Sequence, residues 1–234
     1  MVLHSKTDMV GSLATIFSFL IKGCLILSVL IWLARYRQLP MALRVLGYFL
    51  VFDLAVELLA GYLFSKKINN LPLLHLFTFG EFIFFSFFYY HLIRFLTEHK
   101  RYFYLFFGLV VSFLIVNSTF IQSIHSFNSI AKCTVHLILI IYAVWYFYQM
   151  SFDSEAELKR SDRPLRLINS AVLLYYSGSL FIFMFTNFIQ ANDMRMHRGF
   201  WAFNAGLNVV FQLLVLTGLC LTVLRQTKSS SSWP

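Results

Sequence analysis

The sequence predicts an all-α integral membrane protein, a polytopic transmembrane bundle of about seven helices that forms one domain over residues 1–234. Of the 234 residues, 59% are hydrophobic and only 12% are Asp, Glu, Lys or Arg, whereas soluble domains contain roughly 25% charged residues. The mean hydropathy is +0.72. The apolar runs reach about 20 residues and do not alternate, which favours helices over the short alternating strands of a membrane β-barrel.

Seven stretches are long enough to cross the hydrocarbon core of a bilayer, which requires about 20 helical residues. They lie at approximately 11–34, 43–64, 72–95, 102–122, 127–150, 166–190 and 200–224. Pro40, Pro72 and Pro164 fall at or just before predicted helix starts, where a missing N–H costs little. Since no proline falls inside a span, the broken helices of many transporters are not predicted.

Each stretch also has its own character. The first, 11–34, is longer than the apolar core of a signal peptide and is not followed by a small-residue cleavage site, so we expect it to be retained. The fourth, 102–122, contains no charged residue and is expected to face lipid most. Isolated cysteines within apolar segments predict buried packing rather than a disulfide or a metal site. They are Cys24, Cys133 and Cys220.

Lys and Arg are distributed unequally between the two sets of predicted loops. One side carries twelve: Arg35, Arg37, Arg44, Arg94, Lys100, Arg101, Lys159, Arg160, Arg163, Arg166, Arg225 and Lys228. The other side carries five: Lys6, Lys66, Lys67, Arg195 and Arg198. The positive-inside rule therefore places the N-terminus outside and the C-terminus in the cytoplasm. Orientation and anionic headgroups account for the net charge of +9, so we expect lipid and no nucleic acid as partner.

Ionisable side chains inside the predicted spans are candidates for a functional site, because each costs roughly 2.5–3.5 kcal/mol near the bilayer centre. The primary candidates are Lys22, Asp53, Glu57, Glu81 and His136. Counted from the cytoplasmic helix ends, they fall within about 6 Å of one another in depth. Asp53 and Glu57, four residues apart, share one helix face. This register allows a Lys22–Asp53 pair and a close approach of Glu57 to Glu81.

Amide and hydroxyl side chains extend this polar interior. Asn204, Asn208 and Gln212 are spaced by four and form a polar stripe on one face of 200–224. The secondary candidates are His75, Lys132, Tyr175 and Tyr176. Two interpretations remain open: a structural network of interhelical hydrogen bonds, or a central cavity that binds a small polar ligand or passes protons. The spacing predicts no metal site and no cofactor.

The stretch 69–93, NNLPLLHLFTFGEFIFFSFFYYHLI, resembles uncharacterised bacterial seven-helix membrane proteins. The resemblance covers this stretch alone, from the connection after the second predicted helix through most of the third. It implies no activity and no catalytic residue. It does imply the bacterial cytoplasmic (inner) membrane as the location, and the long predicted connection at 151–165 would then be a solvated cytoplasmic connector.

The function predicted first is a non-enzymatic sensor or signalling accessory whose polar intramembrane cavity binds a small ligand. Lacking an output domain, it would act through a membrane protein partner or as a homo-oligomer. The sequence contains no Walker, GxSxG, kinase or GxGxxG motif. Two alternatives remain open. One is a membrane-embedded lipid-modifying enzyme, with Asp53, Glu57, Glu81 and His136 as acid–base groups, and the other is a proton-coupled transporter or channel.

Overall fold

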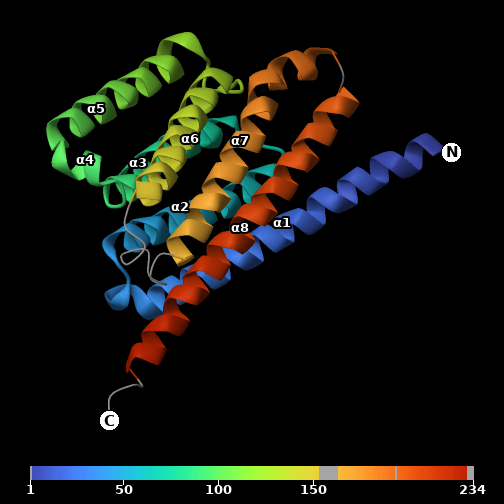
Figure 1. The fold of residues 1–234 in the computed structure, drawn as a ribbon. Helices are drawn as coiled ribbons and strands as arrows, with labels where there is room; N and C mark the ends of the chain where they lie inside the picture. The colour runs from blue at the N-terminus through green and yellow to red at the C-terminus, as the bar shows by residue number, and fades with distance from the viewer. Residues whose placement is uncertain (1, 153–162, 193, 231–234) are drawn as a thin grey trace.

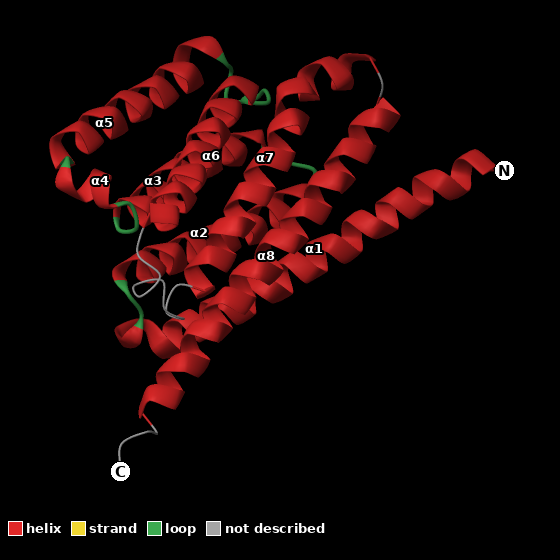
Figure 2. Cartoon of the chain, in the orientation of Figure 1, coloured by secondary structure: helices red, strands yellow, loops and turns green. Residues whose placement is uncertain are grey.

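The computed structural model describes residues 2–152, 163–192 and 194–230, and in these ranges it contains helices and no strand. The helices are α1 (Val2–Arg35), α2 (Met41–Ser65), α3 (Leu71–Tyr90), α4 (Arg94–Glu98), α5 (Lys100–Val116), α6 (Ser129–Phe152), α7 (Arg163–Asn192) and α8 (Met194–Ser230) (Figure 1). A 3-10 turn follows α1 and a π-helical turn follows α5. Short loops join α2 to α3 and α5 to α6 (Figure 2).

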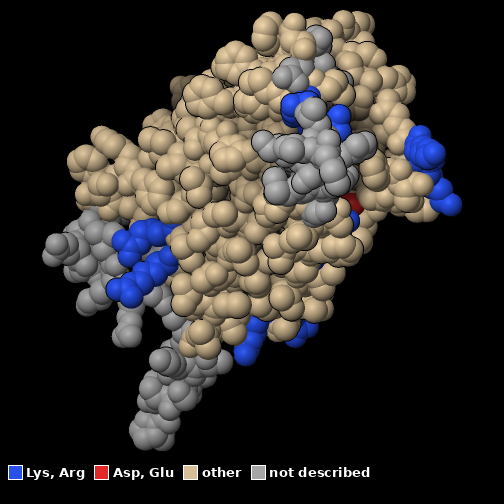
Figure 3. Space-filling model, turned by 90° about the vertical axis from the view of Figure 1, so that its right-hand side faces the viewer, with Lys and Arg blue, Asp and Glu red and all other residues tan. Residues whose placement is uncertain are grey.

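Within the described ranges, six segments are long and apolar enough to cross a membrane, and the prediction of an all-α, multi-pass integral membrane protein is confirmed at this level. They are Thr15–Gln38, Leu71–Tyr90, Lys100–Ile121, Ser129–Phe152, Arg163–Thr186 and Met194–Leu224. α2, which carries Asp53 and Glu57, is not among the six. Figure 3 shows the corresponding surface, a nearly uncharged face with Lys and Arg gathered in separate patches at its edges.

Six of the helices form a closed ring. α1 packs against α2, α2 against α3, α3 against α6, α6 against α7 and α7 against α8, and α8 returns to α1. α5 lies outside this ring, against α3 (Figure 1). Only 17% of its apolar span is buried, against 28% to 50% for the other five spans, so it is the most exposed of the six, as expected of a helix that faces lipid.

Apolar side chains fill one half of the ring, the half in which α1, α3 and α6 end and α2 and α7 begin. Each ring helix contributes a residue that is at most 1% exposed: Leu25, Leu46, Phe85, Ala143, Val172 and Val215. Lipid tails are as apolar as these side chains, so van der Waals packing rather than transfer from water stabilises this half.

The predicted span 72–95 is wrong at its end, because it is divided in the structure. α3 ends at Tyr90, and α4 begins at Arg94. The Gln149 side chain on α6 donates to the Leu92 carbonyl at 3.2 Å and accepts from the Arg94 N–H at 2.8 Å. A side chain distant in sequence thus holds the break by satisfying backbone groups that the helix would otherwise have paired.

Other helices are longer than predicted. α1 begins at Val2 rather than near residue 11, and α8 covers Met194–Ser230 rather than 200–224. The backbone hydrogen bonds of a helix do not depend on apolar side chains, so a helix continues beyond its apolar span. Within the predicted connection 151–165, residues 151–152 and 163–165 are helical, and 153–162 lies outside the described residues.

Candidate functional site

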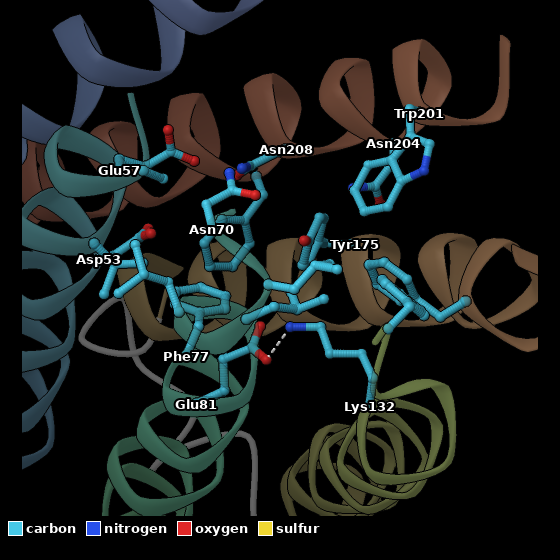
Figure 4. A pocket seen from close by; sticks show the side chains of 18 of the residues that line it. Asp53, Glu57, Asn70, Phe77, Glu81, Lys132, Tyr175, Trp201, Asn204 and Asn208 are labelled. Carbon is cyan, nitrogen blue, oxygen red and sulfur yellow. Dashed lines mark hydrogen bonds and ion pairs between the residues drawn. The ribbon is translucent and has the colours of Figure 1, made fainter. Parts of the chain in front are cut away.

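A cavity of about 340 Å³ occupies the other half of the ring (Figure 4). Its walls come from α2, α3, α6, α7 and α8 and from two adjoining loops, while α1 contributes no lining residue. The polar lining residues are Asp53, Glu57, Asn70, Glu81, Lys132, Tyr175, Tyr176, Asn204 and Asn208. The volume falls at the lower end of the roughly 300–1,000 Å³ range of small-molecule pockets.

Glu81 and Lys132 form a buried ion pair across α3 and α6, with both side chains 1% exposed. The Tyr176 hydroxyl donates to Glu81 Oε1 at 3.3 Å, which adds α7 to the contact. Lys132 Nζ also lies over the rings of Phe77, at 4.6 Å, and Phe183, at 5.4 Å. Glu81 therefore pairs with this lysine. The close approach of Glu81 to Glu57 that the depth count allowed does not form.

Asp53 is buried, and its partner is an amide rather than Lys22. Gln212 Nε2 donates to Asp53 Oδ2 at 2.9 Å, and the same nitrogen donates to Asn208 Oδ1 at 3.4 Å. Lys22 lies instead beside Gly61, with its Nζ 3.5 Å from the position that a Cβ would take there. The allowed Lys22–Asp53 pair does not form, because the Lys22 side chain meets α2 at Gly61, about two turns beyond Asp53.

Glu57 lies one turn from Gly61 on α2 and is therefore the carboxylate on which the charge of Lys22 acts. Neither Glu57 nor Asp53 makes an ion pair with a residue in the described ranges. In Figure 4 the two carboxylates lie together at one end of the cavity, and the Glu81–Lys132 pair lies apart from them. The α2 end of the cavity thus carries carboxylates without a direct counter-ion.

The predicted stripe on α8 faces the interior of the ring. Asn204 and Asn208 line the cavity, and Gln212, which is fully buried, links α8 to Asp53. Asn204 is 8% exposed, and its Oδ1 has no hydrogen-bond partner among the described residues. The Asn204 amide and the Trp201 indole lie at the end of the cavity opposite Glu57 (Figure 4).

The two candidate histidines do not line the cavity. The His136 Nδ1 lies 3.0 Å from the Ser179 hydroxyl, and its ring packs edge-on against Tyr176 and Phe183. His75 lies 3.0 Å from the Ser118 hydroxyl and 3.1 Å from a loop carbonyl. Both are buried and connect neighbouring segments, so they serve packing in this structure.

Aromatic and loop residues complete the cavity but were not predicted as part of it. Asn70 precedes α3, and Phe127 precedes α6. Both are uncharged, so they were not among the ionisable side chains from which the site was predicted. Trp201 lies near the start of a predicted span, where an interfacial tryptophan is expected in any membrane protein. Its ring packs edge-on against Phe127 and Phe183, at 5.9 and 6.0 Å between centroids.

The fold and the cavity define the class of the chain, a multi-pass helical membrane protein with a polar cavity inside its bundle. When compared with protein-family models, with curated proteins and with solved structures, the chain matches none of them. No group of three or more His, Cys, Asp or Glu side chains is placed to hold a metal ion in the described ranges. Chemically, the cavity offers carboxylates, amides and aromatic faces for binding.

Proposed function

We propose that the chain is a non-enzymatic membrane sensor or signalling accessory whose cavity binds a small polar ligand. The uneven filling of the ring supports this function. Phe49 and Phe211, 2% and 3% exposed, line the cavity where the packed half begins. Below them, Tyr89 donates to Asn169, which donates to the Ala143 carbonyl, so hydrogen bonds link α3, α7 and α6 in the packed half. A cavity that is closed at one end by packed side chains suits a ligand that enters and leaves from the other end.

The same proposal includes seven spans with the N-terminus outside and the C-terminus in the cytoplasm. α2 connects α1 to α3 and packs against both, so it runs between two helices that are long and apolar enough to span. In this orientation the cavity belongs to the outer half of the bundle, near the loop that joins α2 to α3. The resemblance of the stretch 69–93 supports the bacterial inner membrane as the location.

Ligand binding would act on helix packing, since the cavity wall is shared by five helices of the ring. A ligand that binds one packing arrangement better than another shifts the population toward it. The change would reach a membrane protein partner, or a second copy of the chain, through the lipid-facing or cytoplasmic surface. Anionic lipid or an acidic partner suits the basic cytoplasmic ends.

Neither alternative function has a specific observation in its favour. An acid–base enzyme using Asp53, Glu57, Glu81 and His136 would need these groups to converge, and His136 faces Ser179 outside the cavity lining. A proton-coupled transporter or channel would need a polar route through the packed half, where the six residues that represent the ring helices are at most 1% exposed.

The test is to fill the cavity and compare ligand responses. Ala60 lines the cavity on α2, whereas Ala55 on the same helix is exposed. The full chain in lipid nanodiscs is screened by thermal unfolding against polar small molecules of each charge. We expect at least one molecule to raise the unfolding temperature of the wild type and of Ala55→Phe but not of Ala60→Phe.

The same molecule should not accumulate in proteoliposomes that contain the chain, with or without a proton gradient. Uptake that depends on the chain would show that it is a transporter rather than a sensor. Conversion of the molecule to a product would show that it is an enzyme. If no molecule distinguishes Ala60→Phe from Ala55→Phe, the cavity is not a ligand site and the proposed function is wrong.

A further inference from the structure

The charges on the cavity wall do not balance. Three carboxylates line it, those of Asp53, Glu57 and Glu81, against the single ammonium group of Lys132. Lys132 is engaged with Glu81, so that pair is neutral as a unit. The Lys22 ammonium group lies beside Gly61, one turn from Glu57, and is not part of the wall. In the part of the chain that the structure describes, the α2 end of the wall therefore holds two carboxyl groups and no ammonium group that pairs with either of them.

A second, independent feature lies at the opposite end of the cavity. The Asn204 side chain is more than nine-tenths buried, lines the cavity, and leaves its Oδ1 without a hydrogen-bond partner among the described residues. An unpaired buried carbonyl oxygen costs about 1–3 kcal/mol, which a ligand carrying an O–H or N–H donor would recover. This oxygen therefore points to a donor on the ligand, remote from the carboxylates (Figure 4).

Aromatic rings form the wall beside Asn204. Trp201, Phe127 and Phe183 pack edge-on or stacked with one another at 5.7–6.0 Å between centroids, and all three line the cavity. Such rings accept a flat apolar body and attract a cation at their faces. An inorganic cation at the carboxylates would leave these rings and the Asn204 oxygen at the other end of the cavity without a partner.

We propose, on the basis of the function proposed above, that the cavity binds a small arylalkyl amine as its monocation. The ammonium group lies between Asp53 and Glu57 and supplies the missing positive charge. The aromatic body extends toward Trp201, and a hydroxyl or N–H on that body donates to Asn204 Oδ1. Charge at one end and a donor at the other distinguish this ligand from simple amines, from sugars and from carboxylates.

Four matched probes test this assignment on the full wild-type chain in nanodiscs, by calorimetric titration. Tyramine carries the charge, the ring and the donor. Tyrosol replaces the ammonium with a neutral hydroxyl, 3-(4-hydroxyphenyl)propanoate replaces it with an anion, and phenethylamine lacks the ring hydroxyl. We expect tyramine to bind best, tyrosol and the anion to bind about tenfold or more weakly, and phenethylamine to bind about five- to tenfold more weakly.

Variants then locate the two ends of the ligand. Asp53→Asn should weaken tyramine binding by about ten- to a hundredfold, because it removes the charged partner of the ammonium. Asn204→Leu should abolish the preference for tyramine over phenethylamine. Glu98→Gln, the same type of change on the exposed helix α4, should leave binding unchanged. If Asp53→Asn does not fold, Glu57→Gln and the wild-type comparison of tyramine with tyrosol still decide the outcome.

The assignment is overturned if tyrosol or the anion binds as tightly as tyramine. It is equally overturned if sodium or potassium chloride displaces tyramine as effectively as phenethylamine does, or if no probe binds. Where a neutral or anionic probe binds and Ala60→Phe abolishes its binding, the proposed ligand-binding function survives and only the amine assignment fails. Where Ala60→Phe leaves the binding of every probe unchanged, both fail.

Discussion

Glu81 and Lys132 place two charged side chains inside the helical bundle, where each is 1% exposed. Removing such groups from water costs several kcal/mol per ion, and close pairing with further hydrogen bonds is needed to offset it. The Tyr176 hydroxyl and the rings of Phe77 and Phe183 supply those additional contacts. The stability of the pair thus depends on three helices, α3, α6 and α7, being in register.

Lys132→Met should destabilise the bundle because it leaves the Glu81 carboxyl buried without its partner. We expect a loss of about 3–5 kcal/mol in the free energy of unfolding. The double variant Lys132→Met with Glu81→Gln should lose clearly less than the sum of the two single variants. Denaturant titration of the purified chain in micelles measures all three, and strictly additive losses would show that the pair is not coupled.

Lys67 adopts a left-handed backbone conformation, with a φ of 58°, where α2 ends. The Ile68 N–H donates to the Leu63 carbonyl at 2.9 Å and the Lys67 N–H to the Phe64 carbonyl at 3.0 Å, the Schellman pattern that usually has glycine at this position. Lys67→Gly should raise the free energy of unfolding by about 0.5–1 kcal/mol, since relief of strain exceeds glycine's entropic cost.

Lys66→Gly is the matched control, because Lys66 has a φ of −90° and gains nothing from glycine. It should be neutral or destabilising in the same denaturant titration. Equal effects at the two positions would contradict a conformational origin.

At the scale of the helix, the Trp32 indole on α1 packs directly against Gly47 on α2. A Cβ at Gly47 would lie 1.9 Å from Trp32 Nε1, and Trp32 is 4% exposed. Gly47→Ala should therefore lower the free energy of unfolding by about 1–3 kcal/mol through overpacking. Gly108→Ala on α5, where nothing lies within 4 Å of the added carbon, should be neutral or stabilise by up to about 1 kcal/mol.

Thermal unfolding of Gly47→Ala and Gly108→Ala, with the wild type alongside, checks this contrast. A similar loss at Gly108 would mean that glycine matters for helix flexibility in general. An unchanged Gly47→Ala would mean that Trp32 moves aside without cost.

Hydropathy predicted the helices well, since each predicted span coincides with a helix that differs mainly at its ends. The orientation that the loop charges indicate stays a prediction. The break between Tyr90 and Arg94 could not be predicted, because Gln149 from another helix maintains it. The order of helices in the ring was also beyond the sequence, because no local pattern indicates that α5 lies outside the ring or that α3 packs against α6.

The candidate site was predicted by residue type and depth but not by pairing. Eight of the twelve candidates line the cavity, because ionisable and amide groups avoid lipid. Depth alone could not say that Lys132 reaches Glu81, since a lysine side chain spans about a helical turn and the contact depends on which helices adjoin. For Lys22, the depth count allowed a pair with Asp53 that does not form, because its side chain lies beside Gly61.

At the scale of the whole molecule, the proposed topology makes opposite predictions for the two ends of α2. In a background with Cys24, Cys133 and Cys220 replaced by alanine, Gln38→Cys and Asn69→Cys each provide one exposed thiol. A membrane-impermeant maleimide should label Asn69→Cys on intact spheroplasts and Gln38→Cys only after lysis. Labelling of both from one side would show that α2 does not cross, and the reverse pattern would invert the orientation.

The ring is closed by the contact between α1 and α8, the first and last helices of the chain. The Gln212 amide that binds Asp53 comes 159 residues later in the sequence. At about 5–20 residues per second, a ribosome needs roughly 10–30 s to synthesise that interval. During insertion Asp53 therefore lacks the hydrogen bond from Gln212 until α8 has been synthesised. The cavity wall is complete only when α8 packs against α1 and α7.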